Sequence, residues 1–294
     1  SKLAHFKSLK KWYFSREMQT PSSTIKVAIL DMYACTTNQG MRGIRKSLQD
    51  FSEKHAISLQ VAEFEVRLSH QLPELDYDIY ISSGGPGSPL ESENTDWEQS
   101  YFNWLNSVID YNNDPLHDRK KKVFFICHSF QMACRYFKLA QVVKRKSQAF
   151  GVFPVHFLPA SKEEVIFKGL PDPFYAVDSR DFQVVQPDLS RMNIMGATIL
   201  AIEKSRPHVP LERAIMAIRF NEHMIGTQFH PEADAIGMIE YLNTDEKKAI
   251  VLENHGIEKW QSMIDQLSDP DKIEKTFATI LPQFLTASIV RETV

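Results

Sequence analysis

Hydrophobic and polar positions follow two patterns in the first half of the chain. Short apolar runs rich in β-branched residues cover residues 25–32, 59–66, 77–82 and 121–127. Between them, apolar residues recur at three- and four-residue steps, as at Ile44, Leu48 and Phe51. The short runs are typical of buried strands, and the wider spacing is typical of amphipathic helices. This alternation predicts βαβ units around a buried parallel sheet.

The pattern changes after about Gly151. Short strand candidates now follow one another closely, with Gly and Pro between them, which predicts an antiparallel section on the same core. Beyond Pro231 the spacing favours helices at 247–253, 257–267 and 273–284. The predicted fold is therefore α/β: a flavodoxin-like, doubly wound and mostly parallel sheet, with an added antiparallel section and C-terminal helices.

The first residues form a separate pattern. Leu3, Phe6, Leu9 and Tyr13 fall at helical spacing with lysines between them, which indicates a short basic amphipathic helix. Such a helix either docks on its own domain or lies on a membrane surface. The expected organisation is an N-terminal helical extension, a central domain and a C-terminal helical extension, at residues 1–24, 25–235 and 236–294.

Composition narrows the class of protein. The 294 residues include 34 basic and 37 acidic ones, which gives a formal net charge of −3. The chain therefore has no excess of positive charge that would bind nucleic acid or an anionic membrane. No apolar run approaches the roughly 18 residues that span a bilayer. Three cysteines are too few for a disulfide framework in a chain of this length. We expect a cytoplasmic protein with no nucleic-acid or membrane partner.

Because function gathers at the carboxyl ends of strands in a doubly wound sheet, the residues after each apolar run carry the candidate chemistry. The first group is Gly84–Gly85–Pro86–Gly87, which follows the run at 77–82. Glycines permit positive φ and uncover backbone N–H groups, so this turn can present donors to an anion. The other interpretation is a tight turn from strand to helix. No Walker lysine follows, so a phosphate loop is not indicated.

The second group surrounds Cys127, where a strand runs directly into a helical pattern. A nucleophile on such an elbow stands clear of the sheet, and the helix N-terminus favours its thiolate. The N–H of His128 would point toward an oxyanion formed at the attacked carbon. The alternative is a buried structural cysteine, which is the interpretation for Cys35 and Cys134.

The third group is His230–Pro231–Glu232, just past an apolar strand. Residues two apart on an extended segment project to the same side, so Glu232 can hold one ring nitrogen of His230 while the other faces a thiol. The remaining histidines show no metal-ligand spacing, and no metal site is expected. A glycine turn, an elbow cysteine and a His-x-Glu pair, all at strand ends, together predict acyl-transfer chemistry.

These motifs resemble those of the class I, triad-type glutamine amidotransferases, including the amidotransferase domain of GMP synthase. That family has a Gly-Gly-Pro turn, a Gly-x-Cys-x-Gly-x-Gln elbow and a strand that ends in His-Pro-Glu. They appear here, in the family's order, as Gly84–Gly85–Pro86, as Cys127 with Gln131, and as His230–Pro231–Glu232. The resemblance covers residues 25–234.

The resemblance implies a mechanism without a cofactor. Cys127 attacks the side-chain amide of glutamine and forms a thioester, with His230 as base and then acid and Glu232 holding His230. The backbone amides of Gly85 and His128 form the oxyanion hole. The products are glutamate and ammonia, and the ammonia passes to an acceptor site.

The same resemblance assigns Gln131 to substrate binding, together with Ser179 and Arg180 in the segment that replaces the family's Ser-His-x-Asp stretch. Phe125 and Ser129 occupy the two glycine positions of the family's elbow. Ser129 is small enough for a tight turn, whereas Phe125 is a candidate for distorting it. Arg180 either meets a carboxylate on a substrate other than glutamine or is a surface arginine.

Three functions therefore stay open. The first is a glutamine amidotransferase or glutaminase, with a separate synthetase subunit as acceptor, because no synthetase pattern follows Glu232. The second is a free-standing γ-glutamyl peptidase or amidase that uses the same triad. The third is a homologue that kept the scaffold for binding or regulation. A homo-oligomer is compatible with all three.

Overall fold

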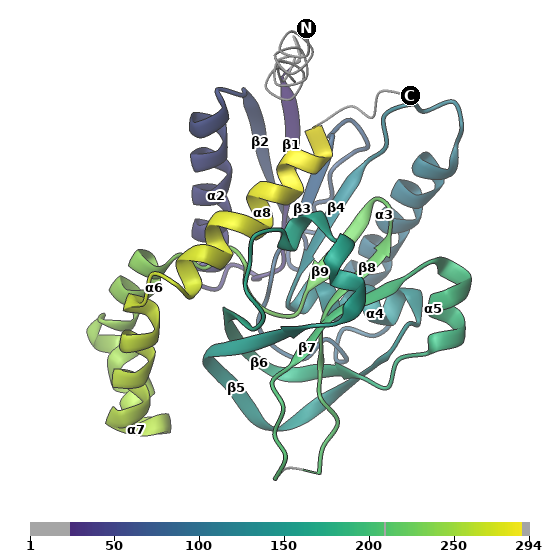
Figure 1. Cartoon of the computed structure of the whole chain (residues 1–294). Coiled ribbons are helices and arrows are strands. Elements are labelled where there is room, and N and C mark those ends of the chain that lie inside the picture. Colours follow the sequence, from purple (N-terminus) through teal and green to yellow (C-terminus); the bar gives the residue numbers. More distant parts are fainter. Residues whose placement is uncertain (1–23, 209, 290–294) are drawn as a thin grey trace, which may run out of the picture.

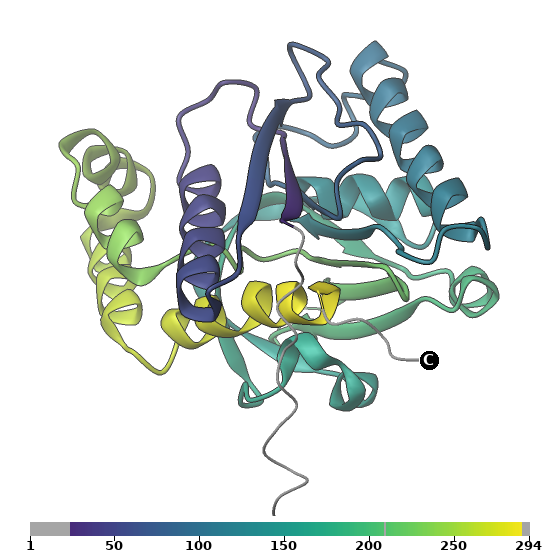
Figure 2. The same ribbon diagram turned by 90° about the horizontal axis from the view of Figure 1, so that it is seen from above.

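The computed structural model describes residues 24–208 and 210–289. The amphipathic helix predicted for residues 3–13 lies outside these residues. Within them, one nine-stranded sheet has the strand order β2-β1-β3-β4-β9-β8-β7-β5-β6 (Figure 1). The helices lie around this sheet, as the view from above also shows (Figure 2).

One half of the sheet is parallel. Its strands are β1 (Ile25–Asp31), β2 (Leu59–Glu65), β3 (Ile79–Ser82), β4 (Lys122–Ile126) and β9 (Met224–Thr227). The pairs β1–β2, β1–β3, β3–β4 and β4–β9 all run parallel. The carboxyl ends of β3, β4 and β9 therefore meet at one edge, and the prediction that chemistry-bearing residues gather there depends on this arrangement.

The other half is antiparallel and contains β5 (Gln141–Phe157), β6 (Phe174–Val185), β7 (Thr198–Glu203) and β8 (Ile215–Asn221). Together the two halves confirm the mixed fold predicted from the sequence. Strand β5 starts ten residues before the change expected at Gly151. The hydrophobic pattern did not predict this first part of the strand, because it is polar and largely exposed. A register irregularity separates that part from the rest, between Lys144 and Ala149.

Helices cover both faces of the sheet. They are α2 (Gly40–His55), α3 (Asp96–Asn113), α4 (His128–Phe137), α5 (Leu189–Met195), α6 (Ala235–Leu242), α7 (Asp245–Ser268) and α8 (Ile273–Ile289), with two 3-10 turns at Pro159–Glu163 and Val165–Phe167. Helices α2 and α8 share one hydrophobic core with Phe124, and α3 and α4 share the opposite core with Phe125. None of the described helices is long and apolar enough to cross a membrane.

Helices α6 and α7 form a hairpin at one side of the sheet (Figures 1 and 2). They pack with β5 and β6 in a third, smaller hydrophobic core. Gly256 interrupts α7 with a φ of 81°, so that the element consists of two helical segments, in agreement with the two helices expected on either side of this residue. Only glycine adopts this conformation without strain.

Candidate functional site

Cys127 lies between β4 and α4, as the elbow pattern predicted. Its φ of 47° and ψ of −96° are unusual for a residue with a side chain. Its backbone N–H donates to the Thr227 carbonyl at 2.8 Å, which ties the turn to the end of β9. The residue is buried and precedes the first turn of α4, where the helix dipole favours a negative charge on sulfur.

The two residues that depart from the elbow pattern are both accommodated. The Ser129 hydroxyl accepts from the Ile126 N–H at 2.9 Å and lies 2.6 Å from the Ser82 carbonyl, to which it donates. The hydroxyl thus joins the elbow to the end of β3. Phe125 is fully buried in the α3–α4 core, so its ring does not occupy the space around the cysteine.

His230 and Glu232 form a buried pair. The Nδ1 atom of His230 lies 2.7 Å from Glu232 Oε1, and the His230 N–H donates to the Val177 carbonyl at 2.9 Å. Among the described residues, the second carboxylate oxygen of Glu232 has no hydrogen-bond partner. Burial alone would lower the pKa of His230, but the Glu232 carboxylate and Cys127 outweigh it and hold this pKa well above its usual value.

Gly84 brings the cysteine and the histidine together. A Cβ atom at this position would lie 2.9 Å from His230 Cε1, 2.9 Å from the Tyr33 hydroxyl and 3.6 Å from Cys127 Cβ. Cys127 and His230 therefore both border this glycine, and only a residue without a side chain fits beside them. Gly85 is equally confined, because a Cβ there would lie 2.4 Å from the Met32 carbonyl oxygen.

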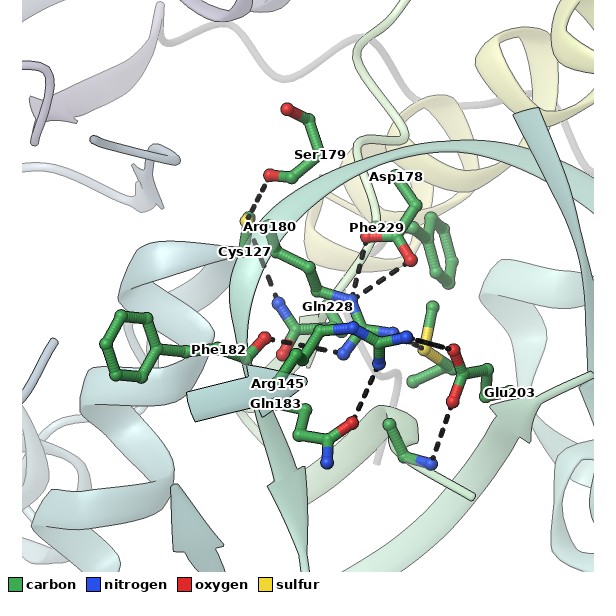
Figure 3. Close-up of polar contacts among 12 residues, drawn as sticks. Cys127, Arg145, Asp178, Ser179, Arg180, Phe182, Gln183, Glu203, Gln228 and Phe229 are labelled. Carbon is green, nitrogen blue, oxygen red and sulfur yellow. Dashed lines mark hydrogen bonds and ion pairs between the residues drawn. The ribbon is translucent and has the colours of Figure 1, made fainter. Parts of the chain in front are cut away.

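A chain of side-chain amides leads to the sulfur. Gln131 Nε2 donates to Gln228 Oε1 at 3.1 Å. Gln228 Nε2 in turn donates to Cys127 Sγ at 3.7 Å (Figure 3). The Sγ atom also lies 3.9 Å from the Ser179 carbonyl. Gln228 is a residue of the site that was not predicted from the sequence. Its position two residues before His230, on a strand that ends at the site, was the available signal.

Arg180 lies inside the protein, so its interpretation as a surface arginine is wrong. It is 4 % exposed, and its Nε donates to both oxygens of Asp178 at 2.9 and 3.0 Å. Its guanidinium also lies 3.5 Å from Glu203, which accepts from Arg145 as well (Figure 3). Glu203 also accepts from Arg206. Burial raises the pKa of Glu203, but the arginines outweigh burial and lower it. The guanidinium is thus engaged by protein carboxylates, and a direct role in substrate binding stays a prediction.

The predicted residues share one cavity of about 380 Å³, lined by Gly85, Cys127, His128, Gln131, Ser179, Arg180, His230 and Glu232. Burial lowers the pKa of His128 to about 3, so its buried imidazole is neutral. The predicted role of His128 concerns its backbone N–H, at the first residue of α4. In the part of the chain that the structure describes, no group of His, Cys, Asp and Glu is arranged to hold a metal.

The chain is similar to known proteins in sequence pattern and in fold. A family model described as glutamine amidotransferase class-I matches residues 41–238. The chain is also similar to the crystal structure of a glutamine amidotransferase from Thermotoga maritima, with a TM-score of 0.66 and 15 % identity over 91 % of this chain and 99 % of that one. No curated protein matches the chain in sequence.

Two further solved structures show the same fold. For a glutamine amido transferase from Methylobacillus flagellatus the TM-score is 0.56 and the identity 17 %, over 92 % of this chain and 93 % of that one. For the glutaminase domain of Trypanosoma brucei CTPS with bound acivicin, the TM-score is 0.55 and the identity 12 %, over 92 % and 96 % of the two chains. At these identities the likeness concerns the fold alone.

Proposed function

Because this chain belongs to the class I glutamine amidotransferase family, we propose that it hydrolyses the side-chain amide of glutamine through Cys127, His230 and Glu232. The observation that carries this proposal is the arrangement around Gly84, where the cysteine and the Glu232-bound histidine face one cavity. Family membership supports the reaction class, and this arrangement supports the roles of the three side chains.

In the first step, His230 takes the proton of the Cys127 thiol and the sulfur attacks the amide carbon. The negative charge that forms on oxygen is stabilised by the backbone N–H groups of Gly85 and His128. Glu232 orients the imidazole and stabilises its charged form, which agrees with the raised pKa of His230. Gln228 donates to the sulfur and thereby favours the thiolate.

In the second step, His230 returns the proton to the nitrogen, and the carbon–nitrogen bond breaks to give ammonia and a thioester on Cys127. A water molecule then attacks the thioester, with His230 again as base. This releases glutamate and regenerates the Cys127 thiol. We further propose that the ammonia passes to a separate acceptor subunit, on the ground of the family's chemistry.

The test is ammonia release from glutamine by the wild-type chain and by Cys127→Ala. We expect Cys127→Ala to reduce release by roughly a thousandfold or more, because it removes the nucleophile. Cys35→Ala, an exposed cysteine, is the matched control and should keep full activity. Cys127 should also be labelled selectively by a glutamine-analogue electrophile at neutral pH. Absence of both ammonia release and labelling would overturn the proposal and favour a binding or regulatory protein.

A further inference from the structure

Arg67 binds the glycine turn at the end of β3 from outside the cavity. It lies two residues after β2, at the edge of the sheet where the carboxyl ends of the parallel strands meet. Its half-buried side chain donates from Nη1 to the Pro86 carbonyl at 2.7 Å and to the Met32 carbonyl at 3.3 Å. The guanidinium therefore bridges the segment that follows β1 and the turn that follows β3.

Both carbonyls that Arg67 binds adjoin Gly85. A Cβ atom at Gly85 would lie 2.4 Å from the Met32 carbonyl oxygen, so the backbone of Gly85 packs directly on that group. Pro86 is the next residue of the turn, and Gly87 follows with a φ of 84°. Glycine loses more conformational freedom on folding than any other residue, and three of the four residues at 84–87 are glycines. A contact from outside the turn is therefore well placed to keep it in one orientation.

Arg67 is itself held in place. Its Cζ atom lies 5.3 Å from the centroid of the buried Trp97 ring of α3, a cation–π contact. The Glu65 carboxylate accepts from the backbone N–H groups of Arg67, Leu68 and Ser69 and so fixes the segment that carries the arginine. A planar guanidinium that is stacked in this way loses less freedom for each hydrogen bond that it forms. Arg67 is thus a rigid support for the turn.

The charge of Arg67 also acts on the first residue of α4. Burial is the main cause of the lowered pKa of His128, and the positive charges of Arg67 and Arg135 lower this pKa further. The field of Arg67 therefore extends to the residue that carries the second proposed N–H donor. A positive charge near both donors favours a negative charge on an oxygen placed between them.

We propose that Arg67 is a positioning residue, which keeps the Gly85 N–H directed into the cavity when an oxyanion forms there. It acts through the Met32 and Pro86 carbonyls, and it does not itself line the cavity. The inference rests on the proposed cysteine chemistry and adds no step or reactant to it. Because the oxyanion forms only after the substrate has bound, loss of this positioning should lower kcat and leave KM nearly unchanged.

The test compares two reactions of the same sulfur. Hydrolysis of glutamine passes through an oxyanion, whereas alkylation of Cys127 by iodoacetamide is a direct displacement that forms none. All proteins carry Cys35→Ala, because Cys35 is the exposed cysteine. We expect Arg67→Met to lower kcat roughly ten- to a hundredfold, up to the loss of one oxyanion-hole donor, while KM and the alkylation rate change less than twofold. Arg67→Lys keeps the charge but lacks the planar group that stacks on Trp97, and should lower kcat at least fivefold.

Arg191→Met is the matched control. The Arg191 Nε atom also donates to a backbone carbonyl, that of Phe137 at the end of α4, and Arg191 does not line the cavity. This variant should keep the wild-type kcat. If Arg67→Met does not fold, Arg67→Lys provides the same comparison of the two reactions.

Three results would overturn the inference: a kcat within twofold of wild type in Arg67→Met, a full kcat in Arg67→Lys, or a parallel fall of hydrolysis and alkylation. The last would indicate general damage to the site. If the wild type releases ammonia and Arg67→Met does so equally well, only the role of Arg67 fails. If the wild type neither releases ammonia nor is labelled by the glutamine-analogue electrophile, the proposed reaction fails and the inference fails with it.

Discussion

Phe125 on β4 lies directly opposite Gly226 on β9 in the parallel pair. A Cβ atom at Gly226 would stand 3.0 Å from the Phe125 Cβ atom and 2.9 Å from the Phe130 ring. The Phe125 ring instead packs at right angles to Phe220, with centroids 5.6 Å apart. The absence of a side chain at Gly226 therefore lets β9 lie close to the backbone and Cβ of Phe125 just before the elbow.

This pairing predicts that Gly226→Ala destabilises the protein by about 1–3 kcal/mol, because an added methyl group overpacks a filled core. The free energy of unfolding in denaturant is the measurement. In a Phe130→Ala background, the same substitution should cost at least about 1 kcal/mol less, because the Phe130 ring carbon that would lie 2.9 Å from the methyl group is then absent. Strict additivity of the two substitutions would contradict the relationship.

Glu232→Gln tests the buried pair through the pH dependence of stability. The pKa of His230 in the folded protein lies well above its ordinary value of about 6.5. A raised pKa contributes stability that is fully present below about pH 6.5 and is lost as pH rises through the folded-state value. The wild type should therefore lose more unfolding free energy between pH 6 and pH 9 than Glu232→Gln.

That difference reports on His230 and its carboxylate partner, because all titrating groups other than Glu232 are common to both proteins. Glutamine keeps an oxygen that can accept from Nδ1, so the geometry of the pair is retained while the charge is removed. The substitution should also reduce ammonia release by tenfold or more, since the charged imidazole loses its stabilising carboxylate. Parallel stability curves for the two proteins would show that the carboxylate does not raise the pKa of His230.

Gln228→Glu tests the amide chain at the sulfur. A glutamate keeps the oxygen that accepts from Gln131 but replaces the donor to Cys127 with a negative charge. We expect the rate of Cys127 alkylation at pH 7 to fall at least tenfold, because a neighbouring carboxylate opposes thiolate formation. Gln228→Leu, which removes donor and acceptor without adding charge, should give an intermediate rate. Equal rates in all three proteins would show that the amide does not act on the sulfur.

Arg180→Gln tests whether Arg180 stabilises the fold through Asp178 and Glu203 or binds substrate. Removing the guanidinium leaves the buried Asp178 carboxylate without its cation, and such losses typically cost 3–5 kcal/mol. We expect a loss of that size in the free energy of unfolding. Arg145→Gln should cost less, because Glu203 keeps Arg180 and Arg206. A raised KM for the substrate with unchanged stability would instead assign Arg180 to substrate binding.

The architecture was largely predictable from local sequence. Buried parallel strands are short apolar runs, and the residues at their ends are recognisable because each run stops abruptly. The early start of β5 was not predictable, since residues such as Lys144 and Arg145 interrupt the apolar pattern where one side of the strand is exposed. In that part, pairing with β6 rather than hydrophobicity maintains the strand.

The candidate site was predictable where its chemistry depends on neighbours in sequence, as for His230 and Glu232. It was not predictable where it depends on register between distant strands. That Phe125 is opposite Gly226, and that Arg180 reaches Glu203, follows from strand pairings that no local pattern encodes. The burial of an arginine thus emerged only with the fold.

Gly256 separates Lys247, in the first segment of α7, from Met263 and Leu267 in the second. Lys247, Met263 and Leu267 all line the cavity. The angle between the two helical segments, which the backbone of Gly256 sets, therefore determines how far Lys247 lies from Met263 and Leu267. Gly256 does not line the cavity, yet its conformation determines the spacing of these lining residues. A substitution at Gly256 is therefore expected to change which molecules the cavity accepts. The Cys127 sulfur and the His230 imidazole would keep their positions, because both residues follow strands of the sheet.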